Sequence, residues 1–213
     1  MGGFKNLGIL GKIPMKINSD HWLESSIRKP LIGGNDMPTR RALVLHFTSG
    51  ASALSSIEFW KSPEAMGACA HFVIDRDGTI YQCRPFDRTA GHAGKSIWTD
   101  PNTGTKYQTP NAVTIGIEFA NAGDSATAEG KAFGGKFTCP AGSDLARHKN
   151  GGPLTHWERF PKKQIDAGKL LAAALVLRYN LDDIVGHDDI APGRKNDPGP
   201  LFPMFEFKNL LNK

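Results

Sequence analysis

The sequence predicts an α/β protein with a single domain, in which helices flank one central mixed β-sheet. Its 213 residues are a length typical of one domain. Short apolar runs alternate with segments of helical periodicity, a pattern that favours the α/β class. Two of the apolar runs flank Arg76–Gly78, and an Asp-Gly pair in this position predicts a β-hairpin. A hairpin joins antiparallel neighbours, so we expect a mixed sheet.

Five short apolar runs are the expected strands, because each has the length and the residue types of a buried strand. They are residues 42–47, 70–75, 79–82, 113–119 and 183–186. Residues 1–35 show no such run, and we expect them to form an irregular N-terminal arm. The domain proper is therefore placed at residues 36–213.

Three helices are expected from periodicity and capping residues. Thr48–Ser52 supplies capping residues ahead of a helix that ends near Trp60. Residues 164–179 carry apolar side chains at helical spacing, and Asn180 is a suitable C-terminal stop. Residues 204–211 predict a short closing helix.

The segments between these elements differ in character. Residues 84–110 and 187–203 are rich in Gly and Pro and are expected to be loops. Residues 121–160 contain many Gly, Ser, Lys and Asn residues and show weak periodicity, so they predict a long loop insertion. A loop of that length in a compact domain is usually functional or mobile.

Composition excludes several classes of protein. The net charge is +5, but no Lys/Arg-rich run of the kind that binds nucleic acid is present. Cys69, Cys83 and Cys139 are far apart and form no CxxC pair, so we expect reduced, partly buried thiols. We therefore expect no nucleic-acid partner, and we expect a monomer.

The first sixteen residues, MGGFKNLGILGKIPMK, do not resemble a signal peptide, because glycine, lysine and proline interrupt their apolar stretch. No run of about 18 apolar residues occurs, so no membrane insertion is expected. The sequence thus predicts synthesis in the cytoplasm without an export signal.

Residues suited to metal binding follow two of the predicted strands. His187 comes directly after residues 183–186 and is followed by Asp197 in a Gly/Pro-constrained loop. His46 lies near the end of residues 42–47. Loops at strand ends are where α/β proteins place their chemistry, and zinc accepts imidazole nitrogen and carboxylate oxygen. A catalytic zinc needs three protein ligands, and His187 and Asp197 are candidates for two of them. A histidine at the end of an apolar strand is by itself more often structural, but together with the other two His46 is the candidate for the third.

Glu118 is unusual because it interrupts an apolar strand, Ile115–Phe119. Alternation of side chains along a strand places it on the face opposite Ile117 and Phe119. A carboxylate there is costly to bury unless it is paired or used. Glu118 is therefore either an outward-facing residue of a half-exposed sheet or a general base that acts on water beside the metal.

Six blocks in this order carry a family resemblance: Leu45–Thr48, Gly50–Ser52, Ala70–Thr79, Gly91–Gly94, Ile115–Glu118 and Gly186–Pro200. They resemble the zinc-dependent N-acetylmuramoyl-L-alanine amidase family of the amidase-2 type. That family includes phage endolysins, anhydromuropeptide-recycling amidases and peptidoglycan recognition proteins. The resemblance covers roughly residues 40–120 and 155–205, and the block around Ile190–Pro200 is its most specific part.

The resemblance implies a role for each matched residue. It implies that His46, His187 and Asp197 bind one Zn²⁺ per chain, that Glu118 acts on the attacking water, and that Lys195 stabilises the oxyanion. His92 matches a histidine of the substrate groove, although Gly91 stands where an aromatic residue is usual, which leaves the groove wall in doubt. Arg194 and Asn111 are the other substrate-binding candidates, with Asn111 equally suited to a turn.

Two features separate the branches of the family. Some phage members use cysteine as the third zinc ligand and carry a tyrosine before the histidine of the second block. Asp197 and Ala70 occupy those positions here, so this chain resembles the Glu/Asp branch. Non-catalytic peptidoglycan-binding members lack at least one zinc ligand, whereas all three matched ligands are present.

The resemblance therefore implies a peptidoglycan hydrolase that cleaves the amide bond between N-acetylmuramic acid and L-alanine. We favour a phage or prophage endolysin, a bacteriolytic and antimicrobial enzyme that acts on the cell wall after cytoplasmic synthesis. A cytoplasmic anhydromuropeptide-recycling amidase and a non-catalytic binding module are the alternatives. The substrate partner is peptidoglycan or a muropeptide in either enzyme.

Overall fold

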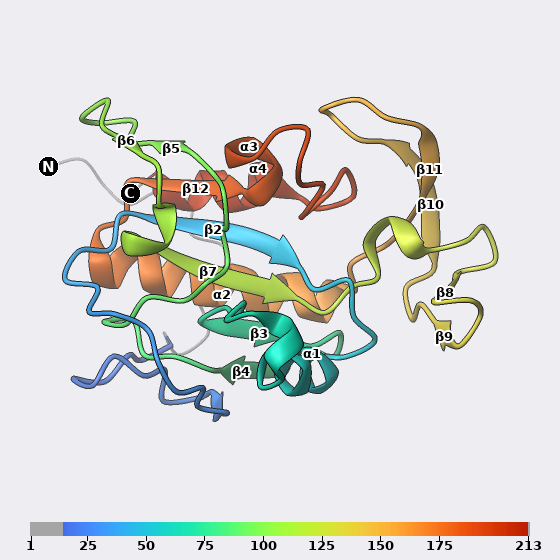
Figure 1. Cartoon of the computed structure of the whole chain (residues 1–213). Coiled ribbons are helices and arrows are strands. Elements are labelled where there is room, and N and C mark those ends of the chain that lie inside the picture. The colour runs from blue at the N-terminus through green and yellow to red at the C-terminus, as the bar shows by residue number, and fades with distance from the viewer. Residues whose placement is uncertain (1–14, 213) are drawn as a thin grey trace, which may run out of the picture.

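The computed structural model describes residues 15–212 as one α/β body around a six-stranded sheet (Figure 1). The strands run in the order β1-β4-β3-β7-β2-β12. Their bounds are β1 Ile27–Arg28, β2 Ala42–Phe47, β3 Phe72–Ile74, β4 Ile80–Gln82, β7 Thr114–Phe119 and β12 Asp183–Gly186. Only β3 and β4 pair antiparallel, through the predicted hairpin, so the sheet is mixed as expected.

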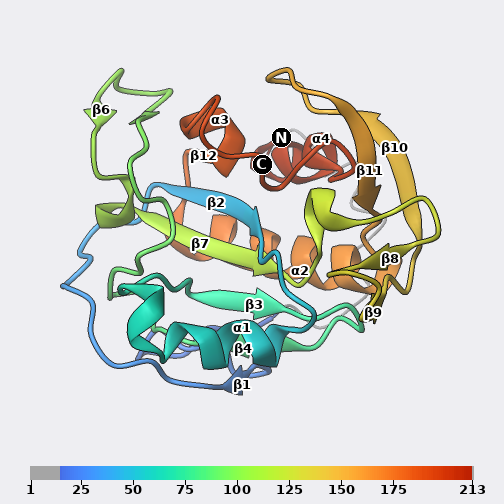
Figure 2. The same cartoon turned by 45° about the vertical axis from the view of Figure 1, so that its right-hand side comes forward.

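Helices cover both faces of this sheet. Helix α2 (Lys162–Tyr179) runs behind β2 and β7, and α1 (Ala53–Trp60) lies on the opposite face against β3 (Figures 1 and 2). The remaining helices are α3 His187–Ile190, α4 Met204–Lys208 and four 3₁₀-helices at Pro63–Ala65, Pro110–Ala112, Gly123–Ser125 and Asn209–Leu211. The predicted α/β architecture is confirmed.

Local sequence explains where the two longer helices begin and end. The side chain of Ser52 accepts a hydrogen bond from the Ser55 backbone, and the Ser55 side chain accepts one from the Ser52 backbone, which forms a capping box at the start of α1. Helix α2 ends at Asn180, whose φ of +52° is the left-handed conformation that asparagine tolerates. Both predicted helix boundaries at these caps agree with the structure.

Because side chains alternate along the strands, the two faces of the sheet carry different residues. The odd-numbered side chains of β2 and β7, such as Leu45 and Ile117, pack with Leu171 and Leu175 of α2 in the main core. The even-numbered positions face the other way. Because the core takes every second residue, the opposite face is left for polar side chains near the strand ends.

Residues 121–160 are not the continuous loop that the sequence predicted. They form two antiparallel hairpins and a 3₁₀-turn, with strands β8 Lys131–Ala132, β9 Phe137–Thr138, β10 Ser143–Arg147 and β11 Leu154–Glu158. A two-stranded hairpin has solvent on much of both faces, and Leu145 and Leu154 are about half exposed. Strands of this kind lack the buried alternation from which strands are recognised, so composition alone suggested a loop.

Smaller elements occur in the two other segments that were expected to be loops. Strands β5 (Trp98–Thr99) and β6 (Lys106–Tyr107) pair within residues 84–110. Helix α3 begins directly at His187. Part of the N-terminal arm also adopts regular structure, because β1 pairs with β4 at the sheet edge.

Two sequence interpretations can be compared only in part with the structure. Residues 1–14, which hold most of the segment judged not to be a signal peptide, lie outside the described residues. Within residues 15–212 no helix is both long and apolar enough to cross a membrane. The three cysteines are free and buried, as expected.

A buried ion pair fastens the insertion to the main sheet. Arg76, in the turn after β3, donates to Glu158 at the end of β11 through Nε to Oε1 at 2.6 Å and Nη2 to Oε2 at 2.8 Å. Both side chains are at least nine-tenths buried. Arg76 Nη1 also donates to the carbonyl of Ala51 at 2.6 Å, so the same guanidinium holds the loop before α1.

Replacing Glu158 with alanine should lower the free energy of unfolding by about 3–5 kcal/mol, because the buried Arg76 charge would lose its partner. Denaturant-induced unfolding followed by circular dichroism measures the change. Arg159→Ala is the matched control, since Arg159 pairs with Asp144 where both side chains are about half exposed. Such a surface pair contributes about 0–1 kcal/mol. Equal, small losses in both variants would contradict the anchoring role of Glu158.

Candidate active site

Three neighbouring parallel strands, β7, β2 and β12, place polar residues in one row at their carboxyl ends. His46 of β2 lies in register with Glu118 of β7. On the other side of β2, Leu45 pairs with Gly186, so His187 follows at the level of His46. In-register neighbours in a parallel sheet point to the same face. The row therefore faces away from α2, on the side that the alternation left for polar groups.

The predicted metal ligands converge on one point. His46 Nδ1 lies 3.0 Å from His187 Nδ1 and 2.7 Å from Asp197 Oδ2, and His187 Nδ1 lies 3.0 Å from the same oxygen. All three side chains are buried. Zinc bonds of about 2.0–2.2 Å in a tetrahedral site separate the ligand atoms by roughly 3.3 Å. The three atoms thus approximate one triangular face of such a site, and the donor set fits a divalent cation.

The protonation of these ligands also suits a cation. Burial lowers the pKa of His46 to about 4, with the hydrogen bond to Asp197 acting in the opposite direction. Burial would raise the pKa of Asp197, but the hydrogen bonds with His187 and His46 outweigh it and hold that pKa below its usual range. At neutral pH His46 is therefore neutral and Asp197 ionised, which are the forms that bind metals.

The nitrogen of each histidine that faces away from the triangle has its own partner. His46 Nε2 lies 3.1 Å from His92 Nδ1, and His187 Nε2 lies 2.9 Å from the carbonyl oxygen of Ala93. Such outer contacts fix the tautomer and the ring orientation of metal-binding histidines. Residues 92–93 therefore orient both imidazoles from one short loop.

His92 occupies space that only glycine leaves open. A Cβ atom at Gly116 would lie 2.5 Å from the His92 ring, so any larger residue in β7 would displace the imidazole. His92 is buried, and its Nε2 lies 3.3 Å from the carbonyl oxygen of Thr114. His92 therefore lies against the predicted metal ligand His46, in addition to the substrate contact that the resemblance implies.

The other predicted site residues fall into two groups. Glu118 and Lys195 line the same cavity of about 270 Å³ as the three ligands and His92. Asn111 is not among the described residues that line this cavity. Its Oδ1 accepts a hydrogen bond from the Ala93 backbone at 2.9 Å, and so it holds the loop whose carbonyl faces His187.

Glu118 has the surroundings of a proton-transfer group. Its Oε2 is buried and has no hydrogen-bond partner among the described residues. Burial raises the pKa of Glu118 well above its ordinary range, the charge of Asp197 adds to this shift, and the Lys195 ammonium opposes it. A carboxylate with a raised pKa can both accept and return a proton near neutral pH.

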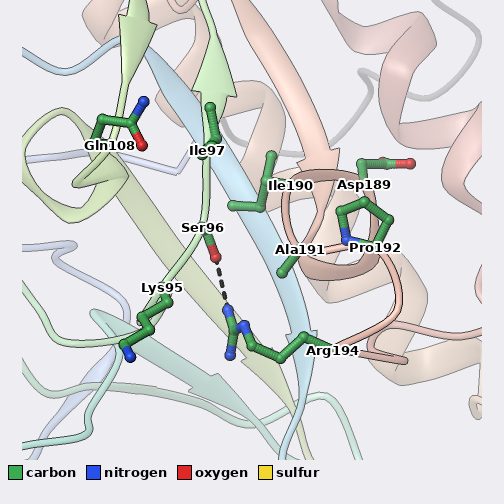
Figure 3. Close-up of a pocket in the computed structure, with 9 residues that line it drawn as sticks. All are labelled: Lys95, Ser96, Ile97, Gln108, Asp189, Ile190, Ala191, Pro192 and Arg194. Atoms are coloured by element: carbon green, nitrogen blue, oxygen red, sulfur yellow. Dashed lines mark hydrogen bonds between the residues drawn. The ribbon is translucent and has the colours of Figure 1, made fainter.

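Arg194 lines a second, larger cavity (Figure 3). Its volume is about 610 Å³, and its lining combines Lys95 and Arg194 with apolar side chains such as Ile97 and Pro192. Arg194 donates from Nη2 to Ser96 Oγ at 2.9 Å and to the Ala93 carbonyl at 3.0 Å. The same carbonyl oxygen of Ala93 lies next to His187 Nε2, so Arg194 links this cavity to the ligand triangle.

The insertion at residues 121–160 holds the loop that carries His187, a contact that the sequence did not predict. The tip of the β10–β11 hairpin reaches α3 (Figure 2), where His148 Nε2 lies 3.0 Å from Asp188 Oδ2 and Lys149 Nζ lies 2.9 Å from Oδ1. Asp188 follows His187, and its backbone N–H donates to the Asp197 carbonyl at 2.8 Å. His148 is buried in this contact, although it lies in the segment that was expected to be a loop. Its long-range partner was invisible in the local sequence.

Replacing His92 with leucine should weaken zinc binding by roughly ten- to a hundredfold, because His46 would lose the partner of its outer nitrogen. Competition with a chromophoric chelator measures the dissociation constant. His92→Asn, which keeps an acceptor, should recover part of the affinity, and Lys95→Ala in the neighbouring cavity is the control. Unchanged zinc affinity together with a raised KM would instead assign His92 to the substrate alone.

The site combines a buried His-His-Asp triangle with a carboxylate and a lysine in one cavity, at the strand ends of an α/β sheet. This combination is typical of a metal-dependent hydrolase. Comparison with known proteins identifies the family within this class. The family model for N-acetylmuramoyl-L-alanine amidase matches residues 35–200. The chain belongs to that family, which confirms the resemblance seen in the sequence.

Curated relatives agree with this assignment. The N-acetylmuramoyl-L-alanine amidase AmiD of Escherichia coli K12 is 35% identical over 126 residues, which are 58% of this chain and 35% of that protein. The 1,6-anhydro-N-acetylmuramyl-L-alanine amidase AmpD of Enterobacter cloacae is 30% identical over 144 residues, 67% of this chain and 56% of that protein. The chain thus spans from about a third to just over half of these relatives.

Solved structures share the fold. A selenomethionine AmpD crystal structure has a TM-score of 0.61 at 25% identity and covers 92% of this chain and 99% of its own. AmiD from E. coli in complex with anhydro-N-acetylmuramic acid-L-Ala-D-gamma-Glu-L-Lys has a TM-score of 0.59 at 26% identity. The match covers 81% of this chain and 58% of the AmiD chain. A mutant endolysin from Bacillus subtilis, at 22% identity and a TM-score of 0.50, is similar in fold alone.

Proposed function

We propose that this chain hydrolyses the amide bond between N-acetylmuramic acid and L-alanine, with one Zn²⁺ held by His46, His187 and Asp197. The observation that carries the proposal is the convergence of three ligand atoms within 3.0 Å of one another at the strand ends. Imidazole and carboxylate donors suit zinc, and three protein ligands leave a fourth position open for chemistry. Glu118 and Lys195 line the same cavity.

The residues of the cavity divide the work of amide hydrolysis. When bound, zinc would polarise the scissile carbonyl and acidify the attacking water. Glu118 would take the proton from that water at Oε2, the oxygen that has no partner within residues 15–212, and then deliver it to the nitrogen of the departing L-alanine. The Lys195 ammonium would stabilise the negative charge that develops on the carbonyl oxygen.

The remaining predicted site residues would act on position and binding. Arg194 and Lys95 bring two cations to the larger cavity, which suits the carboxylates of a muropeptide. His92 and Asn111 would act mainly by holding His46 and the Ala93 loop in place. The buried ring of His92 still lines the cavity, so a substrate contact there remains part of the proposal.

The physical form of the substrate separates two biological roles. The sequence favoured an endolysin that acts on the polymeric wall, and a net charge of +5 suits an anionic envelope. The relatives AmiD and AmpD favour a soluble anhydromuropeptide, because AmpD is named for that substrate and AmiD is seen in complex with one. We propose the anhydromuropeptide as the second candidate substrate, which implies action in the compartment where muropeptides are recycled.

Purified protein should release stem peptides that begin at L-alanine from at least one of two substrates, intact sacculi or a soluble anhydromuropeptide. A strong chelator should abolish the release, and added Zn²⁺ should restore it. Mass spectrometry of the soluble products identifies the bond that is cleaved. Release from sacculi supports the endolysin, and release from the anhydromuropeptide alone supports recycling.

His46→Ala serves as the control for this assay, because it removes one corner of the ligand triangle. The variant should lose both zinc and activity. Full activity and full zinc content in that variant would show that the ligand assignment is wrong. Release from neither substrate by the wild-type protein would leave only the binding module.

Replacing Glu118 with glutamine should reduce kcat by roughly 10²- to 10⁴-fold while zinc content stays unchanged, because the amide cannot accept the water proton. Single-substrate kinetics with parallel metal analysis measures both. Glu58→Gln is the matched control, since Glu58 is an exposed acid on α1 whose side chain pairs with Lys61. A Glu118→Gln enzyme with wild-type turnover would end the proton-transfer role.

A further inference from the structure

A third cavity adjoins the ligand cavity. Its volume is about 390 Å³, and it shares the lining residues Trp60, Ala68 and Cys69 with the cavity that holds the ligands. The rest of the lining comes from the N-terminal arm, at Pro30–Ile32, and from Lys61, Gly67 and Arg84. The two cavities therefore adjoin at Trp60, Ala68 and Cys69.

The arm that forms the wall is held in place by the sheet. The Lys29 backbone donates to the Gln82 carbonyl at 2.8 Å, and the Leu31 backbone donates to the Cys83 carbonyl at 2.9 Å. These bonds extend the pairing of β1 with β4 toward Arg84. Arm and arginine thus meet through ordered backbone contacts.

Arg84 is a buried cation without a carboxylate partner. It is 7% exposed, and its single side-chain hydrogen bond within residues 15–212 runs from Nη2 to the Ile32 carbonyl at 3.2 Å. Its Nε and Nη1 have no partner among the described residues. Residues 1–14 and 213 contain no aspartate or glutamate side chain that would supply one. An unpaired buried charge is costly unless a ligand completes it.

The backbone around the arginine is shaped to accommodate it. Gly34 has a φ of +83°, and a Cβ atom there would lie 2.3 Å from Arg84 Nη1. Only glycine allows the arm to pass this close to the guanidinium in that conformation. The other cation of the cavity, Lys61, is already paired with Glu58 at 2.7 Å, so Arg84 is the cation left for a ligand.

We infer that this third cavity is a subsite in which Arg84 binds a carboxylate of the muropeptide stem, an inference that rests on the proposed amidase function. The stem seen with AmiD contains a γ-linked D-glutamate, and a γ linkage leaves the α-carboxylate of that residue free. The stem ends in a second carboxylate. Arginine recognises either group through charge-assisted hydrogen bonds, which an amide of the same shape does not match.

Three N-acetylmuramyl tripeptides test this subsite with the zinc-loaded protein. One carries L-Ala-D-γ-Glu-L-Lys, the second has the α-carboxylate of D-Glu as an amide, and the third has the terminal carboxylate as an amide. The wild-type enzyme should show a KM roughly ten- to a hundredfold higher for one of the two amides, with kcat changed little. The amide that is disfavoured identifies which carboxylate Arg84 binds.

Arg84→Met should raise the KM for the acid to that of the disfavoured amide and so remove the discrimination. Lys61→Met, in the same cavity, should retain it. Arg84→Lys keeps the charge and should retain part of it, which also provides the test if the methionine variant does not fold. Zinc content should be unchanged in all three.

The outcomes separate this inference from the function on which it rests. A wild-type enzyme that cleaves all three substrates with equal KM would overturn the subsite and leave the amidase intact. Discrimination that survives in Arg84→Met would assign the carboxylate to another residue. A wild-type protein that cleaves none of them and releases nothing from sacculi or an anhydromuropeptide would overturn the amidase itself.

Discussion

The in-register pairing of β2 with β7 and β12 is the constraint on which the site depends. The pairing sets Glu118, His46 and His187 side by side at the carboxyl ends of three strands. Because side chains alternate, the same pairing sends Leu45 and Ile117 to the core under α2. A slip of one residue in β2 would exchange the two sets, burying His46 against α2 and exposing Leu45. Core packing and ligand placement are therefore fixed by the same register.

The parts of the site that lie outside the sheet need supports of their own, because loops do not share that register. The loop from His187 to Asp197 receives its support from the insertion, where His148 and Lys149 hold Asp188. Glu158 of the same hairpin is tied to the sheet by Arg76. Contacts thus run from the sheet through the insertion to the ligand loop, and so a hairpin far from the reacting atoms still bears on their geometry.

Sequence reasoning found the elements whose pattern is local and missed those whose partners are distant. Residues 42–47 and 183–186 were predicted at their observed bounds, and His46, His187 and Asp197 were grouped before their distances were known. In contrast, the contact of His148 with Asp188 was not predicted, because the two residues are forty positions apart and no local pattern links them. The β10–β11 hairpin was missed because its half-exposed strands lack a buried face. Arg84 lies in a segment that was predicted to be a loop, where no local pattern indicates its burial.

Chemistry and selectivity therefore depend on different kinds of structure. The ligands and Glu118 are fixed by strand register, where a change of position also disturbs the core. Arg194 and Arg84 belong to loops that line two other cavities, and the arm that faces Arg84 is an edge addition to the sheet. Loops and edges tolerate substitution better than central strands do. Substitutions in the arm or around Arg194 can therefore alter which muropeptide is accepted without moving the atoms that would cleave it.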